Sequence, residues 1–349
     1  MKKYTGSASM FGAGRGRRQV RILFTCAGRR VELIRAFMRA ASPLGIKIVV
    51  HTADADPSFA ASCIAHHTHL VPTVDSPGYI PALLKIVEKN KIDLLIPLID
   101  TELYKLARAR EKFARLSCAA IISSPRVVKI CQDKLLAYDF LARNGIDTPK
   151  TWSYQQILNQ HRYKFPYFLK PRKGSASKGN FILHNKTDLH TLAPRVPDAI
   201  VQEFVPGDEH TLDVYTGLDG RPRSVVPRKR VEVRGGEVTR ALTVNHPGII
   251  ETGFKVAEAL GECVGVITIQ LFLAFDGRIR VIEINPRFGG GVPLAIRAGA
   301  NFPKWILAEW LGRKPRIREV NFKAGLMMLR YHQAFFKQTK ATKTQGRRT

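Results

Sequence analysis

The sequence predicts a mixed fold, α/β in the first third of the chain and α+β behind it, and two observations support this. Up to about residue 124, short apolar runs alternate with stretches of helical length, which is the pattern of a parallel sheet with right-handed helical crossovers. From about residue 165, apolar runs follow one another across glycine-containing turns, which is typical of antiparallel hairpins. A chain of 349 residues can hold two or three such units, each with its own core.

The composition is that of an ordinary globular protein except for its charge. No uncharged apolar run approaches the ~20 residues of a membrane span, so we expect no membrane-crossing segment. The five cysteines show no CxxC spacing or zinc pattern, which favours a reduced, cytoplasmic protein. The formal net charge is +28, and residues 1–19 carry basic but no acidic side chains. We expect this stretch to be a disordered basic arm, with an organelle transit sequence as the alternative. The other cations are dispersed without an RNA-binding signature, so we expect only weak, nonspecific affinity for polyanions.

In the first third, we expect strands at residues 20–27, 46–52, 93–97 and 118–122, with helices at 31–41, 80–89 and 102–116. Ligands of parallel sheets lie beyond the carboxyl ends of the strands. Five positions fall at those ends and are candidate substrate contacts: Gly28, Arg29, Asp54, Asp100 and Glu102. The alternative, in which Gly28 forms only a tight turn and Asp54 is only a loop residue, stays open. The region has no complete GxGxxG motif, so we do not predict dinucleotide binding.

Two helices are expected at residues 125–131 and 133–144, with Asp133 as the N-cap of the second and Gly145 at its C′ position. Lys134 follows the cap directly, where a cation opposes the helix dipole. This unfavourable placement favours a binding role for Lys134.

A second basic site is expected around a loop rich in glycine and serine. Residues 165–171 read as a strand that brings in Lys170, and residues 180–183 return antiparallel to it. The backbone amides of the connecting loop can close over phosphate oxygens, and its lysines add positive charge. We expect residues 174–179 to be mobile without nucleotide and ordered with it, because fixing glycines is entropically costly. The loop by itself is weak evidence, since many surface hairpins look alike.

A basic hairpin is expected at about residues 228–240. Arginines can hold a carboxylate or phosphate group through two parallel hydrogen bonds, so Arg230 and Arg240 are candidate substrate contacts. For each arginine taken singly, a solvated charge at a sheet edge is the simpler interpretation.

A metal site is predicted where two antiparallel strands, residues 265–274 and 278–285, flank the hairpin dipeptide Asp276-Gly277. If these two residues are the whole loop, Gln270 lies directly opposite Glu283. Asn285 shares a strand face with Glu283 because side chains alternate with period two. One carboxylate and two amide carbonyls suit a hard cation such as Mg²⁺, and the alternative is a solvated polar strand face.

Gln270, Glu283-x-Asn285-Pro286-Arg287 and the glycines that follow resemble the metal-binding signature of the ATP-grasp superfamily. The nearest resemblance is to one ATP-grasp unit of the carbamoyl-phosphate synthase large chain and to biotin carboxylase. It implies a pre-ATP-grasp α/β domain at residues 20–124, a first ATP-grasp lobe at 125–205 with the phosphate loop, and a second lobe at 206–313 with the metal site. Residues 314–349 would be a C-terminal extension with a basic tail.

The resemblance also implies roles for individual residues. Glu203 would meet the adenine at the hinge, Val205 would offer main-chain contacts there, and Glu209 would bind the ribose hydroxyls. Arg287 and Asn285 would be catalytic, and Gln270, Glu283 and Asn285 would hold the metal. Phosphate contacts would come from Lys134, Lys170, Gly174, Ser175, Ser177, Lys178 and Gly179.

Together these features predict an enzyme that uses ATP with Mg²⁺, or with Mn²⁺ in its place. We expect a ligase that activates a small carboxylate as an acyl phosphate and couples it to an amine or similar nucleophile, releasing ADP and phosphate. The alternatives are a phosphotransferase or carboxylase-type enzyme with the same ATP site, and a noncatalytic protein that binds nucleotide or polyanions. A homodimer is an open alternative to a monomer.

Overall fold

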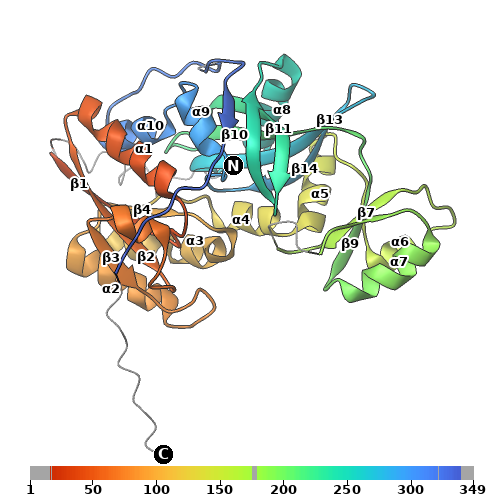
Figure 1. The fold of residues 1–349 in the computed structure, drawn as a ribbon, viewed down its shortest axis with the longest axis horizontal. Coiled ribbons are helices and arrows are strands. Elements are labelled where there is room, and N and C mark those ends of the chain that lie inside the picture. Colours follow the sequence, from red (N-terminus) through yellow and green to blue (C-terminus); the bar gives the residue numbers. More distant parts are fainter. Residues whose placement is uncertain (1–15, 17, 175–178, 321, 339–349) are drawn as a thin grey trace, which may run out of the picture.

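The computed structural model describes residues 16, 18–174, 179–320 and 322–338, and these form three sheets (Figure 1). The first sheet is parallel, as the sequence predicts, and its strands follow the order β3-β2-β1-β4-β5. Its strands are β1 (Gln19–Thr25), β2 (Lys47–Asp54), β3 (His67–Leu70), β4 (Leu94–Pro97) and β5 (Ala119–Ala120). Its helices are α1 (Val31–Ala41), α2 (Tyr79–Asn90) and α3 (Asp100–Arg115), with short 3₁₀ turns at Ser42–Leu44 and Ala60–Ile64.

Helices cover both faces of this sheet, which explains why β1 is an unbroken apolar run. Ile22 and Phe24 belong to the core beneath α1, whereas Leu23 between them packs into the core beneath α2 and α3. The polar loops that follow the strands therefore lie at one edge of a sheet that is buried on both sides.

Two helices, α4 (Pro125–Gln132) and α5 (Lys134–Arg143), connect the first sheet to the rest of the chain. Asp133 caps α5 by accepting hydrogen bonds from the amides of Leu135 and Leu136, both at 3.1 Å, as predicted. The cap fixes the start of α5 and so the position of Lys134.

A small four-stranded antiparallel sheet, in the order β6-β9-β7-β8, forms the lobe at the right of Figure 1. Its strands are β6 (Thr151–Ser153), β7 (Tyr167–Pro171), β8 (Phe181–Leu183) and β9 (Ala199–Glu203), and it carries α6 (Tyr154–Leu158), α7 (Lys186–Leu192) and a 3₁₀ turn at Ala193–Arg195. The β7–β8 hairpin is the one predicted around the phosphate loop. Ser175, Ser177 and Lys178 of that loop, and with them its predicted mobility, lie outside the described residues.

The third sheet has six antiparallel strands in the order β14-β13-β10-β11-β12-β15. The strands are β10 (Gly207–Thr216), β11 (Pro222–Arg234), β12 (Glu237–Thr243), β13 (Gly265–Ala274), β14 (Ile279–Asn285) and β15 (Met327–Leu329). The helices are α8 (Pro247–Leu260), α9 (Val292–Arg297) and α10 (Phe302–Trp310). Phe302, Trp305 and Trp310 of α10 share a core with Phe37 of α1, so this sheet and the first one are joined by apolar packing.

The β13–β14 hairpin places Gln270 opposite Glu283, as the sequence predicts. The predicted two-residue loop, however, is wrong. The amide of Ala274 donates to the carbonyl of Arg278 at 2.9 Å, so the loop has three residues and ends with Gly277 at a φ of 82°.

A bulge in β14 compensates for the longer loop. Leu271 pairs with Val281, whereas Gln270 pairs with Glu283, so Ile282 is an extra residue on β14. Without this bulge, the three-residue loop would place Gln270 opposite Ile282. The predicted pair is thus correct because two departures from a regular hairpin cancel.

The segment expected only as an extension contributes β15, which pairs with β12 at the edge of the third sheet. From β15 the chain runs toward the first sheet, as the dark blue segment in Figure 1 shows. There the guanidinium of Arg35, on α1, lies over the ring of Phe335 at 5.9 Å. This C-terminal strap, residues 326–335, therefore spans from the third sheet to α1.

Candidate active site

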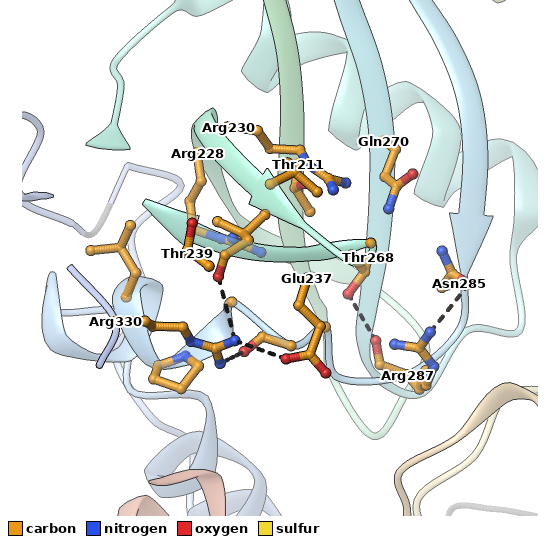
Figure 2. A pocket seen from close by; sticks show the side chains of 18 of the residues that line it. Thr211, Arg228, Arg230, Glu237, Thr239, Thr268, Gln270, Asn285, Arg287 and Arg330 are labelled. Atoms are coloured by element: carbon orange, nitrogen blue, oxygen red, sulfur yellow. Dashed lines mark hydrogen bonds and ion pairs between the residues drawn. The ribbon is translucent and has the colours of Figure 1, made fainter. Parts of the chain in front are cut away.

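A cleft with a volume of about 1790 Å³ takes its lining from all three sheets and from the C-terminal strap. Figure 2 shows Arg228 and Arg230 of β11 on one side of it and Gln270 and Asn285 of β13 and β14 on the other. Most of the polar residues that the sequence singled out are brought together here from distant parts of the chain.

Two lysines form the first cationic group in the cleft. Lys170 of β7 is buried, and its ammonium donates to Oε1 of Gln202 at 2.9 Å. The pKa of Lys170 is lowered to about 8. Burial is the main cause, because the ammonium loses hydration, and Lys134 adds to it, while the carboxylates of Glu283 and Glu209 oppose the change. Lys134 donates to the carbonyl of Gly174 at 2.9 Å, at the start of the predicted phosphate loop.

The predicted metal cluster has the expected residues together in the cleft. Gln270 and Glu283 are cross-strand neighbours, and Nδ2 of Asn285 donates to Oε1 of Glu283 at 3.1 Å. Among the described residues, no group of three or more histidine, cysteine or acidic side chains is arranged to hold a metal. The cluster of one carboxylate and two amides fits a single hard cation that draws its remaining ligands from water and phosphate oxygens.

Glu209 lies beside this cluster and forms an ion pair with Arg230 at 3.0 Å. Burial raises the pKa of Glu209, the nearby Arg230 lowers it, and the charge of Glu283 raises it again. Arg230 is nearly buried and its Nε has no hydrogen-bond partner within the described residues, so the guanidinium retains donor capacity.

The hinge strand β9 presents Gln202 to Lys170. Lys170 pairs with Ile200 and Phe168 with Gln202, so Gln202 shares the face of Lys170. Glu203 is on the other face of the strand, where it accepts from the amide of Lys150 at 3.0 Å and from Arg280 at 3.3 Å, and it also lines the cleft. Gln202 is therefore a cleft residue that the sequence reasoning missed, and applying strand alternation to residues 199–203 would have found it. Val205 lines the cleft.

Arginines and glycines make up the other end of the cleft. Arg287 donates to the carboxylate of Asp100 and, at 3.4 Å, to Oδ1 of Asn285. Arg228 forms a buried ion pair with Asp213, whose Oδ2 lies 2.6 Å from Nε. Nη1 of Arg228 has no partner in the described part of the chain.

The glycines after Arg287 make close packing of these arginines possible. A Cβ on Gly291 would lie 2.2 Å from Nη1 of Arg228, and one on Gly289 would lie 2.9 Å from Oγ1 of Thr268. Any side chain at Gly291 would therefore displace the buried guanidinium or the turn.

Gly28, Arg29 and Asp100 lie in the cleft, whereas three other predicted substrate contacts do not. Glu102 is fully buried and accepts from Tyr79 Oη at 2.6 Å and from the amides of Leu98 and Ile99. Its assignment was wrong because it lies in the first turn of α3 on the side that faces the core. Asp54 instead accepts from the amide of Gly28 at 3.1 Å, and Arg240 is exposed on β12 outside the cleft.

Two arginines that the sequence reasoning did not select, Arg30 and Arg330, line the same end of the cleft. Arg30 follows two selected positions directly, so its place after β1 was a usable signal. Arg330 follows β15, and no sequence pattern pointed to a strand there.

Family models match two parts of the chain. Residues 22–121 match the PylC-like N-terminal domain, and residues 131–291 match the ATP-grasp domain. The chain therefore contains an ATP-grasp domain preceded by a PylC-like N-terminal domain, which confirms the resemblance noted from the metal-site residues.

Curated relatives are similar over part of their length. The 3-methyl-D-ornithine–L-lysine ligase of Methanosarcina barkeri is 26% identical over 244 residues, which are 68% of this chain and 61% of the relative. The carbamoyl phosphate synthase large chain of Clostridium beijerinckii is 27% identical over 232 residues, 60% of this chain and 21% of the relative. The chain thus spans less than two thirds of the length of these relatives.

Solved structures share the fold. Biotin carboxylase from Campylobacter jejuni, in complex with a β,γ-ATP ligand, superposes with a TM-score of 0.68 at 17% identity, over 86% of this chain and 73% of that one. Within the described residues, none of the helices combines the length and apolar character needed to cross a membrane.

Proposed function

We propose that the protein is a Mg-ATP-dependent ligase that activates a carboxylate as an acyl phosphate and couples it to an amine or similar nucleophile, with release of ADP and phosphate. The observation that carries this proposal is one cleft that combines the two lysines, the oxygen cluster and a further set of arginines. The similarity to a protein named as a ligase of 3-methyl-D-ornithine and L-lysine supports the same class of reaction.

In this proposal the nucleotide lies between the four-stranded and six-stranded sheets. Lys134, Lys170 and the loop at residues 174–179 bind the phosphates, while main-chain groups near Glu203 and Val205 meet the adenine. Lys170 suits this role because, among the described residues, its ammonium has one hydrogen-bond acceptor, the amide oxygen of Gln202. Glu209 would accept hydrogen bonds from the ribose hydroxyls through the carboxylate oxygen that does not pair with Arg230.

Gln270, Glu283 and Asn285 would hold Mg²⁺, and Mn²⁺ accepts similar oxygen donors. The metal would supply charge neutralisation for the transferred phosphoryl group. Since the three side chains carry only one negative charge, they fit a cation that is shared with the nucleotide phosphates.

The remaining steps fall to side chains in the cleft. An oxygen of the substrate carboxylate attacks the γ-phosphorus while the bond to the departing ADP oxygen breaks. Lys170 and Arg287 stabilise the charge on the transferred group, and the hydrogen bond from Arg287 to Asn285 keeps both side chains in place. The amine then attacks the acyl carbon, phosphate leaves and the amine loses a proton.

We propose domain boundaries near residues 124, 205 and 313, because each of the three sheets lies within one of the intervals, apart from β15. All five cysteines are free thiols, which supports a reducing, cytoplasmic location.

The test is an ADP-release screen of pools of carboxylates and amines with Mg-ATP, using Glu283→Ala as the inactive control. The proposal requires ADP and phosphate in equal amounts with an amide product. ADP with a phosphorylated product and no free phosphate would identify a phosphotransferase, and dependence on bicarbonate would identify a carboxylase-type enzyme. No ADP release above the Glu283→Ala control with any pool would refute catalysis and leave a nucleotide- or polyanion-binding protein, which the net charge of +28 favours.

A further inference from the structure

Guanidinium groups from both ends of the chain meet at the glycine turn that follows Arg287. A Cβ on Gly290 would lie 3.4 Å from Nη1 of Arg30, which precedes α1. The carbonyl of the same glycine accepts a hydrogen bond from Nη2 of Arg330, on the C-terminal strap. Arg30 and Arg330 thus both approach one glycine, close to Arg287.

These cations are not matched by acids. Arg287 has Asp100 as its partner, whereas the one acidic partner of Arg330 in the described part of the chain is Glu237 at 3.7 Å, and Glu237 lies closer to Arg29 at 2.6 Å. Figure 2 shows Arg330 and Glu237 together at this end of the cleft.

Arg30 is the least compensated of the group. Within the described residues its hydrogen bond is a long one, 3.4 Å to the carbonyl of Leu98, and it forms no ion pair. The pKa of Arg30 is lowered to about 10, first by burial and then by the charges of Arg287 and Arg330, while Glu237 and Asp100 oppose the change. The guanidinium thus lies with little hydration beside other cations, and an anion in the cleft would stabilise its charge.

Arg30 and Arg330 lie beyond the residues assigned to the reaction. Figure 2 shows Gln270 and Asn285 on the opposite side of the view from Arg330, with Arg287 nearest to Asn285. Arg287 is therefore close enough to act on the reacting carboxylate, whereas an anion held by Arg30 and Arg330 would belong to another part of the substrate.

We infer that the carboxylate substrate carries a second anionic group, a carboxylate or a phosphoryl group, and that Arg30 and Arg330 bind it. The inference rests on the proposed ligase function for what the substrate does, but the anion site itself depends only on the geometry. Two guanidinium groups that approach the same glycine can donate to one oxyanion, since glycine leaves the approach open.

The test measures binding of matched pairs of acids to the full chain in the presence of Mg-ADP, by calorimetry. Succinate is compared with succinamate, which lacks one carboxylate, and 3-phosphoglycerate is compared with glycerate. We expect at least one doubly anionic probe to bind about 10-fold or more tightly than its partner. The first pair detects a carboxylate at the site and the second a phosphoryl group.

Variants assign the effect to the two arginines. Arg30→Gln and Arg330→Gln should each remove most of the preference, and Arg330→Lys should retain part of it because the charge is kept. Arg221→Gln removes an exposed arginine outside the cleft and should preserve the preference in full. Equal binding within both pairs, or a preference that survives in both glutamine variants, would overturn the inference.

Binding and turnover separate this inference from the proposed function. A preference for the doubly charged probe that depends on Arg30 and Arg330, without turnover of any acid and amine pool, supports the anion site and refutes the ligase. Efficient ligation of singly charged acids, with no gain from a second anion, supports the ligase and refutes the anion site.

Discussion

If Lys170 binds nucleotide phosphate, the affinity for Mg-ATP should fall steeply between pH 7.5 and 9.5. The pKa of Lys170 is lowered to about 8, so much of the free protein carries a neutral amine above that pH. Phosphate oxygens raise the pKa of a neighbouring ammonium, and we expect the bound form to stay charged up to pH 9.5. Binding above pH 8 must then be accompanied by uptake of a proton.

The size of the effect follows from the fraction of charged Lys170 in the free protein. With a pKa of about 8 this fraction falls from about three quarters at pH 7.5 to about one thirtieth at pH 9.5. The dissociation constant should rise by the same ratio, about 25-fold, which corresponds to about 1.9 kcal/mol. Glu283, Glu209 and Lys134 face the same ammonium, so their charges also contribute to the pKa of Lys170.

Calorimetric titration with Mg-ADP provides the measurement, because the phosphates bound to Mg²⁺ do not titrate in this range. Repeating it in buffers of different ionisation enthalpy counts the protons taken up. Lys170→Arg keeps a fixed charge and should flatten the pH dependence, whereas Lys170→Met should bind weakly at every pH. A flat profile for the wild type, or the same slope in Lys170→Arg, would refute the assignment of Lys170.

Three further predictions concern stability and turnover. Glu283→Ala and Asn285→Ala should each lower ATP turnover by ~10² to 10³ with an unchanged circular dichroism spectrum, and wild-type turnover in either would contradict the metal assignment. Asp213→Ala leaves the buried guanidinium of Arg228 unpaired and should cost about 3–5 kcal/mol in urea unfolding, much more than replacing both partners by apolar residues. Burial raises the pKa of Glu102, so its protonated form favours the folded state below its unfolded pKa, and this stability is lost as pH rises through the folded pKa. Glu102→Gln should therefore raise the free energy of unfolding at pH 8 relative to wild type, with a smaller change at pH 4.

Much of the fold was predictable because local chemistry and burial agree. The helix Val31–Ala41 was predicted residue for residue, since its apolar face and its boundaries are both visible in the sequence. The cap at Asp133 was equally clear. The helix Pro247–Leu260 was not predicted, although its sequence is largely apolar. It packs closely against β11 through Gly253, where a Cβ would lie 2.7 Å from Cγ1 of Val225. A glycine selected for close packing weakens the helical signal that would reveal the helix.

Side-chain direction was harder to predict than strand position. Glu102 and Asp100 both follow the end of β4 within five residues, yet the first turn of α3 directs the two carboxylates to different places. Glu102 contacts Tyr79 in the core, and Asp100 contacts Arg287 in the cleft. An acidic residue at a strand end is therefore a weak indicator of function until the helix face is known.

The arginine end of the cleft shows why long-range contacts limit what a sequence reveals. Arg30 and Arg330 are separated by almost the whole chain, and β15 becomes a strand only because the edge of β12 offers its hydrogen-bonding groups to three residues, Met327–Leu329. Three residues carry too short a pattern to predict a strand, so the position of Arg330 depends on a partner that the local sequence does not specify. By contrast, Gln270 and Glu283 lie in one hairpin, where the turn and the alternation of side chains constrain the pair. The proposed metal site could therefore be found from sequence, whereas the residues that we infer to select the substrate required the structure.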